Sequence, residues 1–200
     1  DPDDRLLWRF PYRRLEAEPI RDAFLSVTCQ MNLEMGGPSI YPKIDPGILA
    51  GQSRPGQGWG TSDERTASRR SVYIFVKRSV IVPLMEVLDA ADSNEPCPRR
   101  NTSTVAPQAL TLLNSEFTNR QAGHFADRLI AECGSDSTKQ IDRAYRLALS
   151  RQPRMDELHA GLDFLRDQRA RIIAKNSPAG SAPGKPSRDA DHDALAAFCL

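Results

Sequence analysis

The stretch that decides the fold is residues 69–117, RRSVYIFVKRSVIVPLMEVLDAADSNEPCPRRNTSTVAPQALTLLNSEF. It holds the one dense run of β-branched and aromatic residues in the chain, Val72–Val76. Both faces of an extended Val72–Val76 would be apolar, which predicts a short strand buried on both sides. Such a strand needs a neighbour, and the nearest extended segment is Pro38–Tyr41.

The C-terminal part of this stretch begins the longest helical pattern. Pro83 is expected to open a short helix within Val80–Leu88. Apolar residues then recur at helical spacing through residues 105–133, with Thr104 as the expected cap. The pair Asn114-Ser115 favours a kink or a split there, because both side chains compete for backbone hydrogen bonds. Gly134 is expected to end the helix.

Upstream of the stretch, the chain opens with an arm that carries large apolar side chains. They are Leu6, Leu7, Trp8 and Phe10. These side chains cannot all face water, so the arm is expected to pack on the body of the protein. A helix should follow from near Glu18 to Thr28, because Pro19 is tolerated only in a first turn. Residues 31–61 are rich in Gly and Pro and predict a long loop.

Downstream, two helices are expected to form an αα-hairpin. Residues 137–140 have the spacing of a capping box and begin a helix that ends before Pro153, and residues 155–174 form the second helix. Residues 176–189 have the composition of a flexible linker, and residues 190–200 read as the start of a truncated helix that ends on exposed apolar residues. The predicted organisation is a single helical domain over residues 1–175, truncated at its N-terminus, then the linker and the helix start.

The fold class that these patterns predict is mainly α, with one short buried strand element, long Gly/Pro-rich loops and a C-terminal αα-hairpin. The net charge of +1 gives no global attraction to nucleic acid or to an anionic membrane. The longest apolar run, residues 80–85, is too short to span a bilayer. The cysteines, Cys29, Cys97, Cys133 and Cys199, lack the spacing of metal or haem motifs; free buried thiols are favoured over two disulfides.

Several motifs together resemble a known family. They are residues 69–79 (RRSVYIFVKRS), 97–101 (CPRRN), 107–114 (PQALTLLN), 35–39 (MGGPS), 51–60 (GQSRPGQGWG) and 145–153 (YRLALSRQP). In this order they are similar to a planctomycete-specific domain of unknown function, over most of the chain. The chain departs from that pattern by starting well inside the domain, by carrying Pro19 and Cys29 where small residues are expected, and by stopping before the final helix.

The resemblance implies a context rather than a reaction. The family's domain lies at the C-terminal end of large, usually exported bacterial proteins, with cytochrome-c-like domains upstream as partners in the same polypeptide. Frequent sulfatase-like neighbours hint at polysaccharide breakdown. An exported, periplasmic or cell-surface location is therefore what the resemblance implies. The present chain has no haem motif, so no cofactor is expected in it.

The candidate ligand site is a group of basic residues with two neighbours. Its members are Arg69, Arg70, Lys77, Arg78, Arg99, Arg100, Asn101 and Trp59. Arginine forks suit carboxylate, sulfate or phosphate groups, so this group could bind an anion. Alternatively, the arginines tie loops to helix ends and to acidic neighbours such as Glu86 and Asp89. Trp59, between glycines, could stack on a sugar ring or could anchor its loop on the core.

Catalytic and metal-binding residues are not predicted. The histidines, His124, His159 and His192, have no second ligand at i+3 or i+4 that makes metal spacing, and no serine lies in a nucleophile elbow. Two functions remain as hypotheses. One is a non-catalytic binding or docking module that contacts anionic polysaccharide or the upstream domains. The other is a substrate-contacting part of a carbohydrate-active enzyme, oxidative and linked to haem.

A composite anion site is expected near residues 99–101. Pro96 and Pro98 favour an extended approach through Cys97, which places Arg99, Arg100 and Asn101 just before a helix N-terminus. If the end of the predicted strand abuts that helix, Arg99 or Arg100 should lie within about 10 Å, roughly a Debye length, of Lys77 or Arg78. In the alternative, Arg99 pairs with a carboxylate of its own loop, Glu95 or Asp92.

Overall fold

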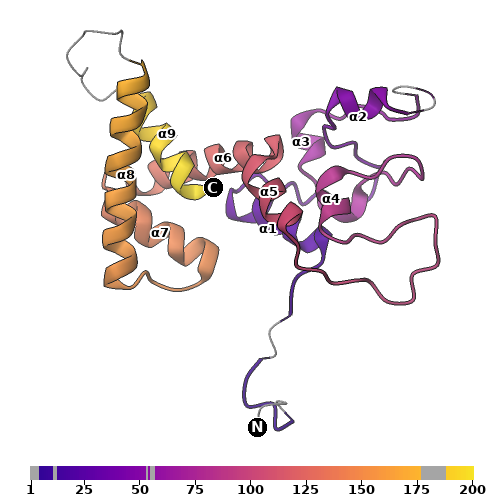
Figure 1. Ribbon diagram of the computed structural model, residues 1–200, viewed down its shortest axis with the longest axis horizontal. Helices are drawn as coiled ribbons and strands as arrows, with labels where there is room; N and C mark the ends of the chain where they lie inside the picture. The colour runs from indigo at the N-terminus through magenta and orange to yellow at the C-terminus, as the bar shows by residue number, and fades with distance from the viewer. Residues whose placement is uncertain (1–4, 11–12, 53, 55–56, 177–187) are drawn as a thin grey trace.

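The computed structural model describes residues 5–10, 13–52, 54, 57–176 and 188–200, and this part of the chain is mainly helical (Figure 1). Its elements are α1 (Ala17–Val27), α2 (Pro46–Ala50), α3 (Glu64–Ala67), the 3-10 turn η1 (Ser71–Tyr73), α4 (Pro83–Val87), α5 (Ala106–Asn114), α6 (Glu116–Cys133), α7 (Ser137–Leu149), α8 (Met155–Asn176) and α9 (Arg188–Cys199). The described residues contain isolated β-bridges but no sheet. The mainly helical class is therefore confirmed.

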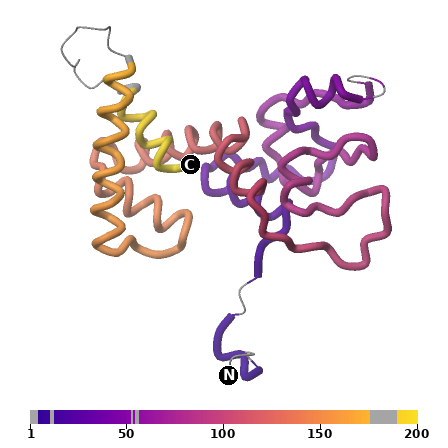
Figure 2. The backbone as a smooth tube through the Cα atoms, viewed as in Figure 1, coloured from indigo at the N-terminus to yellow at the C-terminus, as the bar shows by residue number. Residues whose placement is uncertain are grey.

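Helix α6 runs between two groups of helices (Figure 2) and contributes side chains to two hydrophobic cores. Phe125, Ala126 and Leu129 of its C-terminal half are buried in the first core, together with residues of α7, α8 and α9. Phe117 at its other end packs against the second core, which α1 and α4 build around Ala17 and Leu84. The α7–α8 hairpin thus belongs to a core of four helices, α6 to α9. The candidate site lies beside the second core, which α1 and α4 build.

The helix boundaries follow the local signals in the sequence with small shifts. Helix α1 begins at Ala17, which leaves Pro19 in the first turn, where the missing N–H has no helical partner to lose. The expected long helix is split at Ser115, whose side chain caps α6 by accepting the N–H of Thr118 at 3.2 Å. Gly134 ends α6 with a φ of 65°, a conformation that favours glycine. The N-cap of α5 is Val105 and not Thr104.

The predicted strand Val72–Val76 is wrong. Ser71–Tyr73 forms a 3-10 turn, and only Ile74 makes a parallel bridge, to Ile40. Val72 and Val76 are each 71% exposed instead of buried. The reason is a long-range contact, because Asp22 of α1 accepts the N–H of Ser71 at 2.7 Å and fixes the chain in a turn there. The expected neighbour, Pro38–Tyr41, does supply the bridging residue.

The hairpin is present with one change at its start. The cap of α7 is Asp136, which accepts the N–H groups of Thr138 and Lys139, so the capping box predicted at residues 137–140 is not the one used. In the turn before α8, Arg151 donates two hydrogen bonds of 2.7 Å to Glu157. This fork, with the N–H of Arg154, lowers the pKa of Glu157 to about 2.

Helix α9 begins at Arg188 and packs between α6 and α8 (Figure 1). Its Ala194 and Leu195 are buried, and Phe198 and Cys199 pack partly covered against the same core, so the expected exposed apolar end is wrong for these two residues. Burial raises the pKa of the Cys199 thiol to about 12. The predicted linker falls mainly on residues 177–187, which lie outside the described residues.

The prediction that the N-terminal arm packs on the body of the protein is wrong. Leu6, Leu7, Trp8 and Phe10 are 65–84% exposed. The backbone of the arm does not pair with the body either, since the described residues of the arm belong to no helix or bridge.

The thiols are less buried than expected. All the cysteines are free, as predicted, but Cys29 and Cys97 are exposed.

Replacing Leu195 by alanine should test whether α9 is an integral part of the four-helix core. Leu195 is 2% exposed, so Leu195→Ala leaves a cavity and should lower the free energy of unfolding by about 3 kcal/mol. Urea denaturation followed by circular dichroism measures this change. Leu149→Ala, at a side chain that is 56% exposed, is the control and should cost less than about 0.5 kcal/mol. Equal costs for the two variants would contradict the packing of α9.

Candidate functional site

Two adjoining grooves form a trough beside α4 and the Ser71–Lys77 segment. The first, called the apolar groove, has a volume of about 360 Å³ and lies between the first turn of α1, the Ser71–Lys77 segment and α4. The second, called the basic groove, has a volume of about 720 Å³ and lies between the loop around α2 and residues 77–81. Lys77, Val80 and Ile81 line both grooves, so the two are neighbours.

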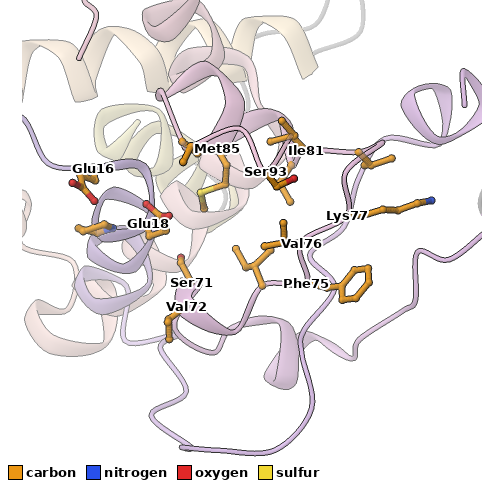
Figure 3. Close-up of a pocket in the computed structure, with 16 residues that line it drawn as sticks. Glu16, Glu18, Ser71, Val72, Phe75, Val76, Lys77, Ile81, Met85 and Ser93 are labelled. Atoms are coloured by element: carbon orange, nitrogen blue, oxygen red, sulfur yellow. The ribbon is translucent and has the colours of Figure 1, made fainter. Parts of the chain in front are cut away.

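The apolar groove has a charged group at each end. Glu16 and Glu18 lie at one end and Lys77 at the other, with Val76, Ile81 and Met85 among the apolar side chains between them (Figure 3). Apolar surface in such a groove favours an apolar occupant, and the end charges would orient it. The groove therefore suits an elongated ligand more than a compact one.

The basic groove is polar and carries more positive than negative charge. Arg54, Lys77 and Arg78 line it, and the one acidic residue among its described lining is Glu86. The Lys77 ammonium donates hydrogen bonds to the side chain of Gln52 and to the carbonyl of Gln57, which fasten the loop around α2. Among the described residues Arg78 has no ion pair, so its guanidinium is available to a ligand.

Arg69, the first of the predicted ligand residues, is a buried structural group. Its side chain donates to the carbonyls of Glu34, Gly36 and Pro38 and stacks on the ring of Tyr73 at 3.9 Å. It is only 3% exposed, and every one of these partners belongs to the protein itself. The anion-binding prediction is therefore not supported at Arg69, and the alternative, that arginines tie loops together, describes it.

A second buried arginine, which the sequence analysis did not single out, supports the first. Arg21 of α1 donates to the carbonyls of Arg69 and Ala67 at 3.1 and 2.6 Å, and to the Ser71 hydroxyl at 3.1 Å. Burial lowers the pKa of Arg21 to about 10. The local sequence gives no signal for this role, because the partners are 46–50 residues away in the chain.

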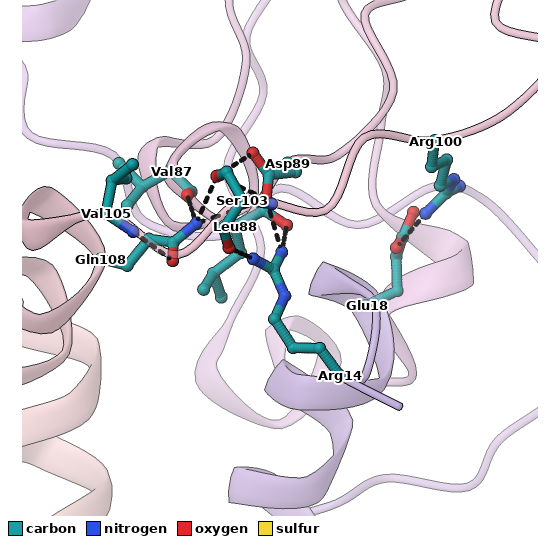
Figure 4. A network of polar contacts seen from close by, with 9 residues as sticks. All are labelled: Arg14, Glu18, Val87, Leu88, Asp89, Arg100, Ser103, Val105 and Gln108. Atoms are coloured by element: carbon teal, nitrogen blue, oxygen red, sulfur yellow. Dashed lines mark hydrogen bonds and ion pairs between the residues drawn. The ribbon is translucent and has the colours of Figure 1, made fainter. Parts of the chain in front are cut away.

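Arg70 and Arg100 are engaged in ion pairs. Arg70 lies 3.6 Å from Asp22, and Arg100 lies 2.6 Å from Glu18 and 3.0 Å from Glu16. Desolvation alone would raise the pKa of Glu18, but the hydrogen bond from Arg100, the Glu18 backbone N–H and the charge of Arg100 together lower it. These contacts, of which Figure 4 shows the one to Glu18, place Arg100 beside the two carboxylates that line one end of the apolar groove.

The remaining predicted residues are not gathered into one site. Arg99 and Asn101 are exposed and line neither groove. In the described part of the chain Arg99 forms no ion pair, so the predicted alternative of pairing within its own loop is not observed either. Helix α5 begins at Ala106, which leaves Asn101 outside its first turn. Of the predicted basic group, Lys77 and Arg78 alone line the basic groove.

The loop that carries Arg99 and Arg100 is closed at its base by a polar network (Figure 4). Asp89 accepts the N–H of Ser103 at 2.9 Å and its hydroxyl at 2.8 Å, and pairs with Arg14 at 2.7 Å. Gln108, 8% exposed, donates to the carbonyl of Val87 and to the Ser103 hydroxyl, both at 3.0 Å. The hydrogen bonds from the Ser103 backbone and hydroxyl, followed by that from Arg14, lower the pKa of Asp89.

Trp59 packs in an aromatic cluster. Its ring lies 5.6 Å from that of Tyr41 and 6.2 Å from that of Phe75, both in edge-on arrangements. Gly60 permits this packing, because a Cβ there would come 2.8 Å from the Tyr41 ring. The geometry favours the second of the two predicted roles, in which Trp59 anchors its loop on the core.

The described residues contain no cluster of three or more His, Cys, Asp or Glu side chains arranged to hold a metal ion. His124 and His192 each approach Asp127, at 3.9 and 3.1 Å, in what are pairwise contacts. Within the same part of the chain, no helix is both long and apolar enough to cross a membrane.

Replacing Arg69 by lysine tests its structural role. Lysine lacks the fork needed to reach three carbonyls, so Arg69→Lys should lower the free energy of unfolding by about 2 kcal/mol. Arg70→Lys is the matched control: its side chain is 58% exposed with one ion pair, and the cost should stay below about 0.5 kcal/mol. Chemical denaturation provides both values, and an unchanged stability in Arg69→Lys would refute the assignment.

The Asp89 network predicts a dependence of stability on pH. A carboxyl whose pKa is lowered by folding stabilises the protein above its unfolded pKa of about 4, and this contribution is lost as the pH falls through the folded pKa. Asp89→Asn should therefore be less stable than the wild type at pH 7, and the difference should shrink below about pH 4. Denaturation midpoints across this range provide the measurement.

Asp163→Asn serves as the control, because it removes an exposed carboxylate from α8, outside the network. A stability difference between Asp89→Asn and the wild type that is the same at all pH values would contradict the role given to Asp89.

Comparison with known proteins identifies one family. Residues 1–165 match the family described as PSD1, protein of unknown function (DUF1553). No curated protein and no solved structure matches the chain.

Proposed function

The chain belongs to the PSD1 family of proteins of unknown function, and we propose that it is a non-catalytic binding module that holds an anionic polysaccharide in the basic groove. The observation that carries the proposal is the groove itself. Its volume is about 720 Å³ and cationic side chains line it. One of these, Arg78, has no ion pair within the described part of the chain.

The lining of the groove matches the chemistry of an acidic sugar chain. Arg78 can bind a carboxylate or sulfate through two parallel N–H groups, and Lys77 adds a point charge beside it. Gln52, Gln57 and Ser79 offer amide and hydroxyl groups for sugar hydroxyls. The volume falls within the range of about 300–1,000 Å³ that ligand sites in proteins occupy.

The buried and paired arginines define the limits of this site. Arg69 is enclosed by loop carbonyls, and Arg70 and Arg100 are held by carboxylates, so a ligand would have to displace partners to reach them. The proposal therefore uses Lys77 and Arg78 from the predicted group and adds Arg54. Glu86 would repel an anion on one side of the groove and so bias its orientation.

The proposal includes the setting that the family resemblance implies. An anionic polysaccharide is met outside the cytoplasm, so the module would act in an exported polypeptide. Cytochrome-c-like domains upstream would then be its covalent partners. This module would contact the upstream domains through other surfaces, so that the basic groove stays open to the polysaccharide.

Arg78→Ala is the variant that tests the site. It should weaken binding to a sulfated or carboxylated polysaccharide about fivefold, as expected for one exposed ion pair of about 1 kcal/mol, and the loss should shrink at high salt. Affinity gel electrophoresis with chondroitin sulfate and with a neutral glucan in parallel gels provides the measurement. Lys77 is less suitable for substitution, because it also fastens the loop around α2.

Arg99→Ala is the matched control, since Arg99 is likewise exposed and its removal changes the net charge equally. It should leave retardation by the sulfated polymer unchanged. If both variants weaken binding to the same extent, attraction by overall charge explains the result and the groove assignment fails. Equal retardation of the wild type by the neutral and the sulfated polymer also overturns the proposal.

A further inference from the structure

One wall of the apolar groove is an extended segment with an open backbone edge. Ile74 in this segment has a φ of −61° and a ψ of 130°. On one edge, Ile40 donates its N–H to the carbonyl of Tyr73 and accepts the N–H of Phe75. Successive residues of an extended segment point their backbone groups to opposite edges. The C=O of Ile74 and the N–H of Val76 therefore face away from Ile40, and neither has a hydrogen bond in the described part of the chain.

This open pair of groups is complementary to the backbone of an extended peptide. The N–H and the C=O of one residue in an extended chain point to the same side, so a single residue can bond to both groups. Ile40 shows this arrangement on the opposite edge, where it fills the pair that Tyr73 and Phe75 offer. A hydrocarbon chain in the groove would leave both groups without partners, which carries a desolvation cost. The backbone therefore favours a peptide over a lipid.

Apolar side chains around the open edge favour an occupant that alternates apolar and polar residues. Val72 and Val76 line the groove and are each 71% exposed, and Ile81 and Met85 line it as well. Every second side chain of an added strand would point into the groove and cover these groups, whereas the others would face solvent. Addition of a strand to an exposed edge is a common way for domains to bind extended segments.

The charges at the two ends of the groove select the ends of the occupant. Glu16 and Glu18 share a single guanidinium, that of Arg100, and the Glu16 side chain is 60% exposed, so these groups together keep a net negative charge. At the other end, the Lys77 ammonium bonds to uncharged groups of the loop around α2 and has no ion pair in the described part of the chain. A basic residue is therefore favoured at the first end and an acidic residue at the second.

We propose that the apolar groove binds an extended peptide segment of a partner protein, which adds as a strand to the Ile74–Val76 edge. Alternate apolar side chains of this segment enter the groove, with a basic residue at the Glu16–Glu18 end and an acidic residue at the Lys77 end. This site differs from the basic groove in its lining and in the class of its ligand, which is a protein rather than a sugar chain.

A synthetic peptide of sequence KTVTVTE serves as the probe, because its lysine, valines and glutamate share one face of a strand and its threonines favour an extended backbone. Fluorescence anisotropy with the full 200-residue chain should show saturable binding. Val76→Asp places a charge in the groove and should weaken binding about tenfold. Leu33→Asp is the matched control, since Leu33 is also 71% exposed but lies outside the groove, and it should leave the affinity unchanged.

The end charges are tested with the peptide ETVTVTE, in which glutamate replaces the lysine. This peptide should bind about fivefold more weakly at low salt, because it loses one exposed ion pair at the Glu16–Glu18 end. The difference between the two peptides should shrink at high salt. Equal affinities at low salt would contradict the assigned ends.

Backbone pairing is tested with two further peptides, one methylated at its valine nitrogens and the other at its threonine nitrogens. Only alternate N–H groups of an added strand face the edge, so one of the two should lose binding and the other should keep it. The Val76 amide should also exchange more slowly when KTVTVTE is bound, whereas the Phe75 amide, already bonded to Ile40, should change little.

Three outcomes overturn the proposal. The first is a failure of KTVTVTE to bind. The second is equal affinity of the two methylated peptides, since it would show that no backbone edge is read. The third is a Val76→Asp variant that binds the probe as tightly as the wild type.

Discussion

Two buried guanidinium groups, those of Arg21 and Arg69, supply hydrogen bonds that a sheet would otherwise supply in this half of the molecule, where the described residues form none. Main-chain carbonyls in a packed region need hydrogen-bond donors, and a strand ladder would normally supply them. Here Arg69 donates to carbonyls of residues 34–38, and Arg21 donates to the carbonyl of Arg69 itself. The position of the Ser71–Lys77 segment, and with it one wall of the trough, depends on these contacts.

Burying two cations so close together carries a cost, and the lowered pKa of Arg21 reflects its desolvation. With a pKa of about 10, Arg21 is still charged at neutral pH, so its hydrogen bonds to carbonyls remain charge-assisted. Asp22, the next residue, offsets part of the cost and also accepts the N–H of Ser71. We infer that the pair specifies one loop arrangement more than it increases the net free energy of unfolding.

Features set by nearby residues could be predicted from the sequence, and those set by distant residues could not. The α5–α6 split at Ser115 and the end of α6 at Gly134 follow from local caps. The segment Val72–Val76 has the composition of a buried strand, but its turn is imposed by α1, 49 residues away for the Asp22–Ser71 contact. The surroundings of the basic residues are set in the same way: a sequence shows where the arginines are, but not that Arg69 is enclosed by loop carbonyls while Arg78 forms no ion pair in the described part of the chain.

The two grooves cannot act independently, because Lys77 belongs to both. Its ammonium is held by the loop around α2, so a ligand that draws Lys77 toward either groove must also move that loop. Ligands in the two grooves are therefore coupled through Lys77, and linkage requires that each change the affinity of the other by the same factor. By fixing the Ser71–Lys77 segment, Arg21 and Arg69 thus set the position of the wall that carries Lys77, the residue common to both grooves.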